Sequence, residues 1–245
     1  MDGTVLQLSL FLGATFAAAL VAGVSGFAFA LVAAAVWLHV LTPLETATLI
    51  ISYGLIVQGY GVWKLRHAFS WERLWPFIVG GAPGVVIGVY VLRWANPSHL
   101  RIGIAAFLVL FSIYSLARPS LKPVRGGAVA DAIVGFFSGF LGAMAGFPGI
   151  LIVIWCGLQG WPKDVQRGVF QPASVAMLAM SAVGLGVTGS ISLNTVYLFL
   201  IGLPALALGT WAGFRLYGRI DEEGFRRIVL WLLLAAGLFL IASLR

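Results

Sequence analysis

The chain alternates between long apolar segments and short polar gaps along its whole length. Several segments approach or exceed the ~20 residues that an α-helix needs to cross a lipid bilayer. The segments cover residues 5–22, 26–41, 45–63, 74–92, 99–117, 128–143, 147–159, 167–188, 195–215 and 226–243. This pattern predicts an all-α polytopic membrane protein.

The first two apolar segments of each half are separated by glycine. The first break, AGVSGFAFA, contains Gly26, and the second, GAMAGFPGI, contains Gly146. Glycine and proline weaken the continuity of a helix. Each pair of segments is therefore predicted to form a glycine-broken helical hairpin, over residues 5–41 and 128–159.

The two halves of the chain match each other at offsets of 119 to 121 residues, and later Arg101 matches Arg226 at an offset of 125 after a short insertion. The matched positions include Gly26 with Gly146, Pro43 with Pro162, and Pro83 with Pro204. Internal duplication of this size is typical of secondary transporters. We predict a first repeat over residues 1–121 and a second over residues 122–245, each a hairpin followed by three spanning helices.

The charges predict that the two repeats have opposite orientations. If each hairpin enters and leaves on one side, 12 of the 15 Lys and Arg residues share a side, and only Arg93, Arg101 and Arg245 lie opposite. If each hairpin is one continuous span, the division is 7 to 8. Because cytoplasmic loops are enriched in Lys and Arg, we predict inverted repeats in the inner (plasma) membrane, with the basic loops in the cytoplasm.

Composition excludes several other classes of protein. With 61% hydrophobic and 9% charged residues, the chain has too little charge for a soluble domain. The net charge of +7 does not predict nucleic-acid binding, because no soluble domain is available to carry a basic patch. The single cysteine, Cys156, lies in an apolar segment and is predicted to be a packed core residue. No His, Asp or Cys cluster indicates a metal, a cofactor or an enzyme.

The glycine breaks are the strongest candidates for a binding site. A helix that begins at membrane depth carries N–H groups and a dipole that attract anions. We therefore predict an anion site between the two breaks. Its residues include Ser25, Gly26, Phe27, Gly146, Phe147, Pro148 and Gly149. The alternative is that the glycines only allow close helix packing.

Two polar side chains share one helix face after the second break. Arg167 and Gln171 are four residues apart, and Ser174 continues the same face. A guanidinium group suits sulfonate or carboxylate oxygens, although this position also suits an anchor in the headgroup region. Gln171 lies a turn deeper and needs a hydrogen-bonding partner. The corresponding residues of the first half, Thr48 and Ser52, offer hydroxyls and no arginine.

Two acidic residues, Glu45 and Asp131, lie near the starts of apolar segments. An acid inside a membrane is a candidate proton carrier, so both are candidates for ion coupling. Their positions favour a more ordinary role as N-terminal helix caps. Asn96, Asn194 and Asp221 also precede apolar segments and are predicted N-caps.

The stretch GFFSGFLGAMAGFPGI followed by GWPKDVQRGVFQP resembles a branch of the sulfite exporter TauE/SafE family, also called toluene sulfonate uptake permeases. The family's K-D-x-x-R-x-x-x-Q-P run lies here between Lys163 and Pro172. GVSGFAFALVAAAVWLHVLTPLETATL is similar to the family's glycine-rich opening, but has Phe29 and Ala30 where many members have glycines. The resemblance covers nearly the whole chain and implies secondary transport of a sulfur-containing or other small organic anion, coupled to an ion gradient.

We therefore predict a secondary transporter of sulfite, an organosulfonate or an organic acid that works by alternating access, coupled to protons or another ion. The expected partners are a small anionic substrate and the lipid bilayer, and a homodimer is allowed. An anion channel and a non-transporting membrane assembly subunit are the alternatives. A channel's flux would neither saturate nor show counterflow.

Overall fold

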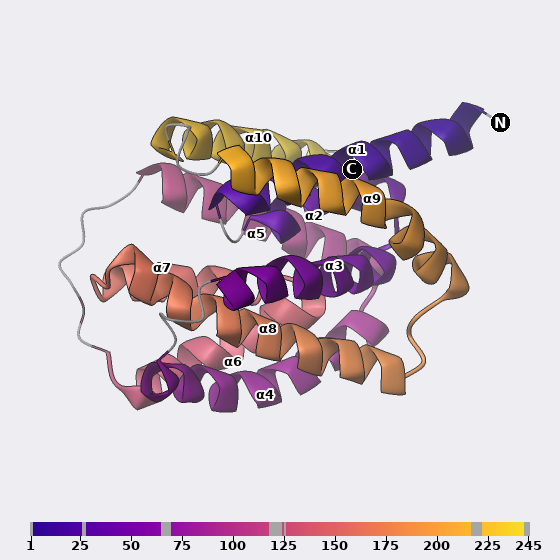
Figure 1. Ribbon diagram of the computed structural model, residues 1–245. Coiled ribbons are helices and arrows are strands. Elements are labelled where there is room, and N and C mark those ends of the chain that lie inside the picture. The colour runs from indigo at the N-terminus through magenta and orange to yellow at the C-terminus, as the bar shows by residue number, and fades with distance from the viewer. Residues whose placement is uncertain are drawn as a thin grey trace. The chain divides into compact units, whose positions relative to one another are not determined.

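The computed structural model describes residues 2–25, 28–64, 70–117, 124, 126–216 and 222–242 (Figure 1). Ten α-helices and no strands lie in these ranges, which confirms the predicted all-α membrane class. The helices are α1 (Asp2–Ser25), α2 (Phe29–Val40), α3 (Pro43–Lys64), α4 (Trp71–Trp94), α5 (Pro97–Ala117), α6 (Ala128–Ala145), α7 (Ile150–Leu158), α8 (Lys163–Val187), α9 (Leu193–Leu216) and α10 (Glu222–Ala242).

Six of the described helices are long and apolar enough to cross a membrane: α1, α4, α5, α6, α8 and α9. Four of these are predicted spans, whereas α1 and α6 are the first arms of the two predicted hairpins. The second arms are short, with 12 residues in α2 and 9 in α7. A helix rises 1.5 Å per residue, so α7 is about 14 Å long, well below the ~30 Å of a hydrocarbon core.

The helices group into two compact units, and each unit draws segments from both halves of the sequence. Unit 1 contains residues 1–50, 95–119 and 193–245, and unit 2 contains residues 51–94 and 120–192. Each unit therefore carries one of the two hairpins. The division of the chain into two inverted sequence repeats stays a prediction.

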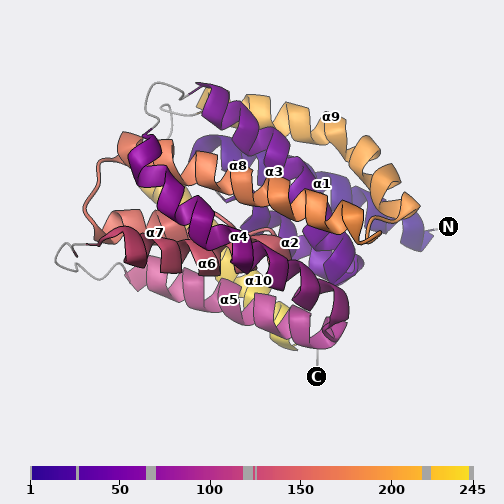
Figure 2. The same ribbon diagram turned by 90° about the horizontal axis from the view of Figure 1, so that it is seen from below.

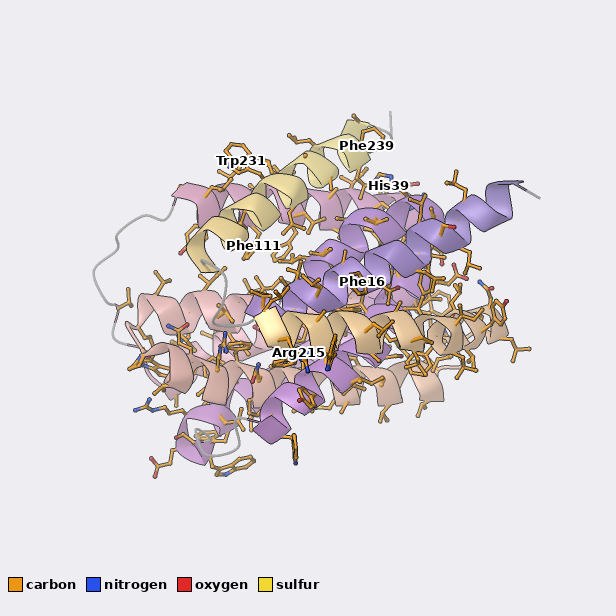
Figure 3. All side chains as sticks on the ribbon, turned by 45° about the horizontal axis from the view of Figure 1, so that its top comes forward. Phe16, His39, Phe111, Arg215, Trp231 and Phe239 are labelled. Carbon is orange, nitrogen blue, oxygen red and sulfur yellow. The ribbon has the colours of Figure 1, made fainter. Side chains whose placement is uncertain are left out.

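In unit 1, α1 packs along α9, and α5 packs along α10 (Figure 1). The contact of α1 with α9 is made through small residues, because a side chain at Gly209 or Gly213 would meet backbone atoms of Phe16 or Leu20. Helix α2 joins the two pairs. Its Trp37 stacks on Phe11 of α1 at 5.0 Å, and its His39 lies 5.3 Å from the Phe239 ring of α10 (Figure 3).

In unit 2, α4 and α6 run side by side with their backbones in close contact (Figure 2). Glycines of both helices line this contact, and a Cβ on any of them would meet backbone atoms of the other helix. They are Gly80, Gly84 and Gly88 of α4, and Gly135 and Gly139 of α6. Small residues of this kind allow close helix packing in lipid, where no hydrophobic force drives helices together. Helix α8 packs against both α4 and α6.

Candidate anion-binding site

The second glycine break is a true helix end. Gly146 adopts the left-handed conformation, with φ 77° and ψ 25°, which favours glycine. Its N–H donates to the Gly142 carbonyl at 2.9 Å, and the Phe147 N–H donates to the Leu141 carbonyl at 3.2 Å. The bond from Gly146 to Gly142 is the 5→1 bond of an αL C-cap motif, which terminates α6 and satisfies one of its last carbonyls. The predicted break of the helix at Gly146 is confirmed.

A new helix, α7, begins immediately after this break. Its N-cap is Gly149, and no side chain caps it. The N–H groups of its first turn have no partner within the helix, as at every helix N-terminus, so this end carries a positive partial charge. Pro148 precedes the N-cap and packs against Gly142, where a Cβ would lie 2.8 Å from that of Pro148.

Helix α8 brings its polar face to the start of α7. A Cβ added at Gly149 would lie 2.7 Å from Ser174 Oγ, so only a residue without a side chain fits there without displacing the serine. The Ser174 hydroxyl is fully buried and donates to the Phe170 carbonyl at 2.7 Å. The structure thus brings together the second break and the polar face of α8, all within unit 2.

Gln171 lies one turn before Ser174 and is only 4% exposed. Its Oε1 is buried and has no hydrogen-bond partner. The amide packs against α3 at Gly61, where a Cβ would lie 2.9 Å from Gln171 Nε2. An unpartnered buried polar atom costs about 1–3 kcal/mol, and such atoms are rare outside sites that receive a ligand, ion or water. Gln171 is therefore the best-supported residue of the candidate site.

A second buried polar group without a partner in unit 2 is a hydroxyl on α6. Ser138 Oγ is fully buried, and the structure gives it no hydrogen bond. This residue was not predicted from the sequence. Its signal was present, because Ser138 lies seven residues after Asp131 and therefore shares a helix face with it. Its hydroxyl adds a second orphaned polar group to unit 2.

Arg167 precedes Gln171 by one turn of α8, is partly buried, and interacts with other groups of the protein. The side chains of Lys163 and Asp164, which begin the same run, lie outside the described part of the chain. The choice between ligand and membrane anchor for Arg167 stays open on this geometry.

The first break is described only in part, because Gly26 and Phe27 lie outside the described residues. Helix α1 ends at Ser25, whose Oγ accepts a hydrogen bond from the Ala28 N–H at 3.3 Å. This break belongs to unit 1 and the second break to unit 2, so a shared site between the two remains a prediction.

The two first-half hydroxyls lie on α3. Thr48 is buried and donates to the Leu44 carbonyl of its own helix at 2.7 Å. Ser52 is partly buried and also has an interaction partner. Thr48 belongs to unit 1 and Ser52 to unit 2, because the boundary between the units falls within α3.

Glu45 is part of a helix cap. The Thr42 N–H donates to Glu45 Oε2 at 3.1 Å, and the Glu45 N–H donates to Thr42 Oγ1 at 3.2 Å. This reciprocal pair is a capping box, with Pro43 at the first helical position. The cap expected at Glu45 is confirmed, and Thr42 is its missed partner. The T-x-x-E spacing was the signal that could have found it.

Asn194 was predicted to be an N-cap, and this is wrong. It lies inside α9, and its Nδ2 donates to Glu45 Oε1 at 2.8 Å. Its side chain therefore binds a residue 149 positions away in the sequence and does not cap its own helix. Asn96, in contrast, accepts a hydrogen bond from the Ser98 N–H at 2.9 Å, as expected for the N-cap of α5. The third predicted N-cap, Asp221, lies outside the described residues.

Asp131 joins the two arms of the second hairpin. It is 9% exposed, and its Oδ1 accepts hydrogen bonds from Trp155 Nε1 at 2.7 Å and Gln159 Nε2 at 3.2 Å, both contributed by the second arm. Gly127 occupies the N-cap position of α6, so Asp131 is not the cap that its position suggested. Neither Trp155 nor Gln159 was predicted, although their spacing of four residues places them on one helix face.

A comparison with protein families matches residues 10–240 to the family described as Sulfite exporter TauE/SafE. The chain belongs to this family. The searches of curated proteins and of solved structures find no match.

Membership of the TauE/SafE family, together with the apolar helices, makes the chain a multi-pass membrane protein of a transporter family. It confirms the resemblance found in the sequence. Cys156 of this TauE/SafE protein is a buried free thiol, as predicted. Among the residues that the structure describes, no group of three or more His, Cys, Asp or Glu is placed to hold a metal ion.

Proposed function

We propose that this TauE/SafE protein is a secondary transporter that moves a small anion, sulfite or an organosulfonate or organic acid, by alternating access. It works in the inner (plasma) membrane with its Lys- and Arg-rich loops in the cytoplasm. The family description supports sulfite as the first substrate to test.

The observation that carries this proposal is the buried Gln171 amide, whose Oε1 has no partner in the protein. One turn further along α8, Ser174 meets Gly149 at the start of α7. The positive end of the α7 dipole favours a negative charge, and Gln171 Oε1 offers an acceptor for a proton that the substrate carries. Arg167 completes the proposed site as a cation on the same face of α8.

The division into two compact units supports alternating access. Each unit contains one hairpin, and each is assembled from both halves of the chain. Alternating access needs parts of the protein that can move as bodies, and inverted repeats supply such bodies in many secondary transporters. Asp131, a buried acid that links the hairpin arms, is the proposed coupling group, whereas Glu45 is occupied as a cap.

A substitution at Arg167 separates the role of ligand from that of anchor. We expect Arg167→Ala to abolish saturable sulfite binding by the purified protein while the folded protein is retained, because the proposed site would lose its cation. The measurement is equilibrium binding of labelled sulfite in detergent, with thermal unfolding as the folding control. Unchanged affinity would assign Arg167 to the membrane surface.

A further inference from the structure

We propose that Gln171 makes the site selective for monoanions that carry their own O–H group, such as hydrogen sulfite, over anions of equal charge that have none. This inference rests on the proposed transport of an anion and specifies which form of the anion is bound. The O–H of the ligand donates to Gln171 Oε1, while the remaining oxygens of the ligand accept hydrogen bonds.

The inference rests on Gln171 Oε1, which has no partner in the protein and can only accept a hydrogen bond. An amide oxygen has two lone pairs and no proton, so it repels the bare oxygens of a fully deprotonated anion. Gln171 Oε1 is buried and lacks a partner in the protein. A ligand that donates satisfies this atom, and a ligand that cannot donate leaves it unpaired. Sites with a buried polar group discriminate strongly against analogues that lack the matching partner.

The surroundings favour one negative charge rather than two. The helices around Gln171 carry few charged or titratable groups among the residues whose side chains the structure describes. They are Arg167 on α8, Glu45, Tyr53 and Tyr60 on α3, Cys156 on α7, Asp131 on α6, and Glu72, Arg73, Tyr90 and Arg93 on α4. The carboxylate of Asp131 on α6 already accepts hydrogen bonds from Trp155 and Gln159. Among the described side chains of α8, one arginine, Arg167, shares the Gln171 face, and one positive charge matches a monoanion.

Gly61 positions the amide. A Cβ at this residue would lie 2.9 Å from Gln171 Nε2 and 3.2 Å from Oε1, so Gly61→Ala would displace the group that selects the ligand. Gly59, on the same helix, has no atom within 4 Å of the position that an added Cβ would take, so Gly59→Ala is a matched control. This pair of variants tests the position of the amide without changing the amide.

The experiment compares two probes at one pH, so that titration of the protein plays no part. Purified full-length protein in liposomes takes up labelled sulfite against competing 2-hydroxyethanesulfonate or ethanesulfonate. The two probes carry the same single charge, neither releases sulfite, and only the first carries an O–H group. We expect 2-hydroxyethanesulfonate to compete on the order of tenfold better, the effect of one satisfied buried hydrogen bond.

Gln171→Met keeps the size of the side chain and removes the acceptor, so the two probes should then compete equally. Gly61→Ala should also reduce the preference, and Gly59→Ala should retain it. Equal competition in the wild-type protein that transports sulfite would overturn this inference and leave the proposed function standing. Absence of any sulfite uptake in intact vesicles would remove the proposed function together with the inference.

Discussion

Asn194 Nδ2 donates a 2.8 Å hydrogen bond to Glu45 Oε1 and so joins the first turns of α9 and α3 within unit 1. The other carboxylate oxygen of Glu45 accepts hydrogen bonds from the backbone N–H and the hydroxyl of Thr42. One acidic side chain therefore completes a capping box and also bridges two helices that lie far apart in the sequence.

This geometry predicts a structural role for Glu45. Glu45→Ala should lower the free energy of unfolding by about 1 kcal/mol, the usual effect of losing a helix cap. Glu45→Gln keeps a side-chain acceptor and should cost less. Thermal unfolding of the purified variants measures both. If Glu45→Gln instead abolished gradient-driven uptake while leaving stability intact, the residue would be a coupling group rather than a cap.

Asp131 should contribute more to stability than Glu45, because it is more deeply buried. Asp131→Ala leaves the Trp155 indole N–H and the Gln159 amide without their acceptor, and we expect a loss of about 2–3 kcal/mol. Asp131→Asn retains an amide oxygen at the same place and should lose less.

Trp155 fluorescence and thermal unfolding report on this contact, and uptake driven by a proton gradient reports on coupling. As the proposed coupling group, Asp131 predicts that Asp131→Asn retains exchange of anion for anion but loses gradient-driven accumulation. Full accumulation by a stable Asp131→Asn protein would remove Asp131 from the coupling mechanism.

The glycine contact between α4 and α6 makes a third prediction. A methyl group at Gly84 would meet the backbone of Phe136, so Gly84→Ala should destabilise the protein by about 1–3 kcal/mol through overpacking. Gly103 of α5 has open space around the position of an added methyl group, and Gly103→Ala should be neutral or stabilise by up to about 1 kcal/mol. Equal unfolding temperatures of the two variants would contradict the close packing of α4 on α6.

How much of this could be predicted depends on the range of the interactions. The end of α6 at Gly146 was predictable because it follows from local chemistry, a glycine that adopts the left-handed conformation two residues before a proline. The polar face of Arg167, Gln171 and Ser174 follows from helical periodicity, which is also local. The family resemblance rested on this same stretch.

The tertiary partners could not be predicted in the same way. In a membrane protein, apolar side chains face both lipid and neighbouring helices, so the apolar pattern does not indicate which helices pack together. Asn194 illustrates this limit, since its position predicted a cap and its partner is Glu45 on another helix. Likewise, nothing in the local sequence around Asp131 indicates Trp155 and Gln159 as its partners. The same limit applies to the two units. The apolar pattern does not indicate that each unit combines segments from both halves of the chain.

The most direct test of the central claim is counterflow of labelled sulfite in liposomes containing the wild-type, Gly149→Ala or Gly157→Ala protein. A methyl at Gly149 would press on Ser174 Oγ in the proposed site, whereas Gly157 of the same hairpin arm has open space around it. We predict saturable counterflow in the wild type and in Gly157→Ala, and a rate on the order of tenfold lower in Gly149→Ala, equivalent to about 1.4 kcal/mol. Flux that does not saturate, or equal rates in the two glycine variants, would contradict an anion transporter whose site lies at the start of α7.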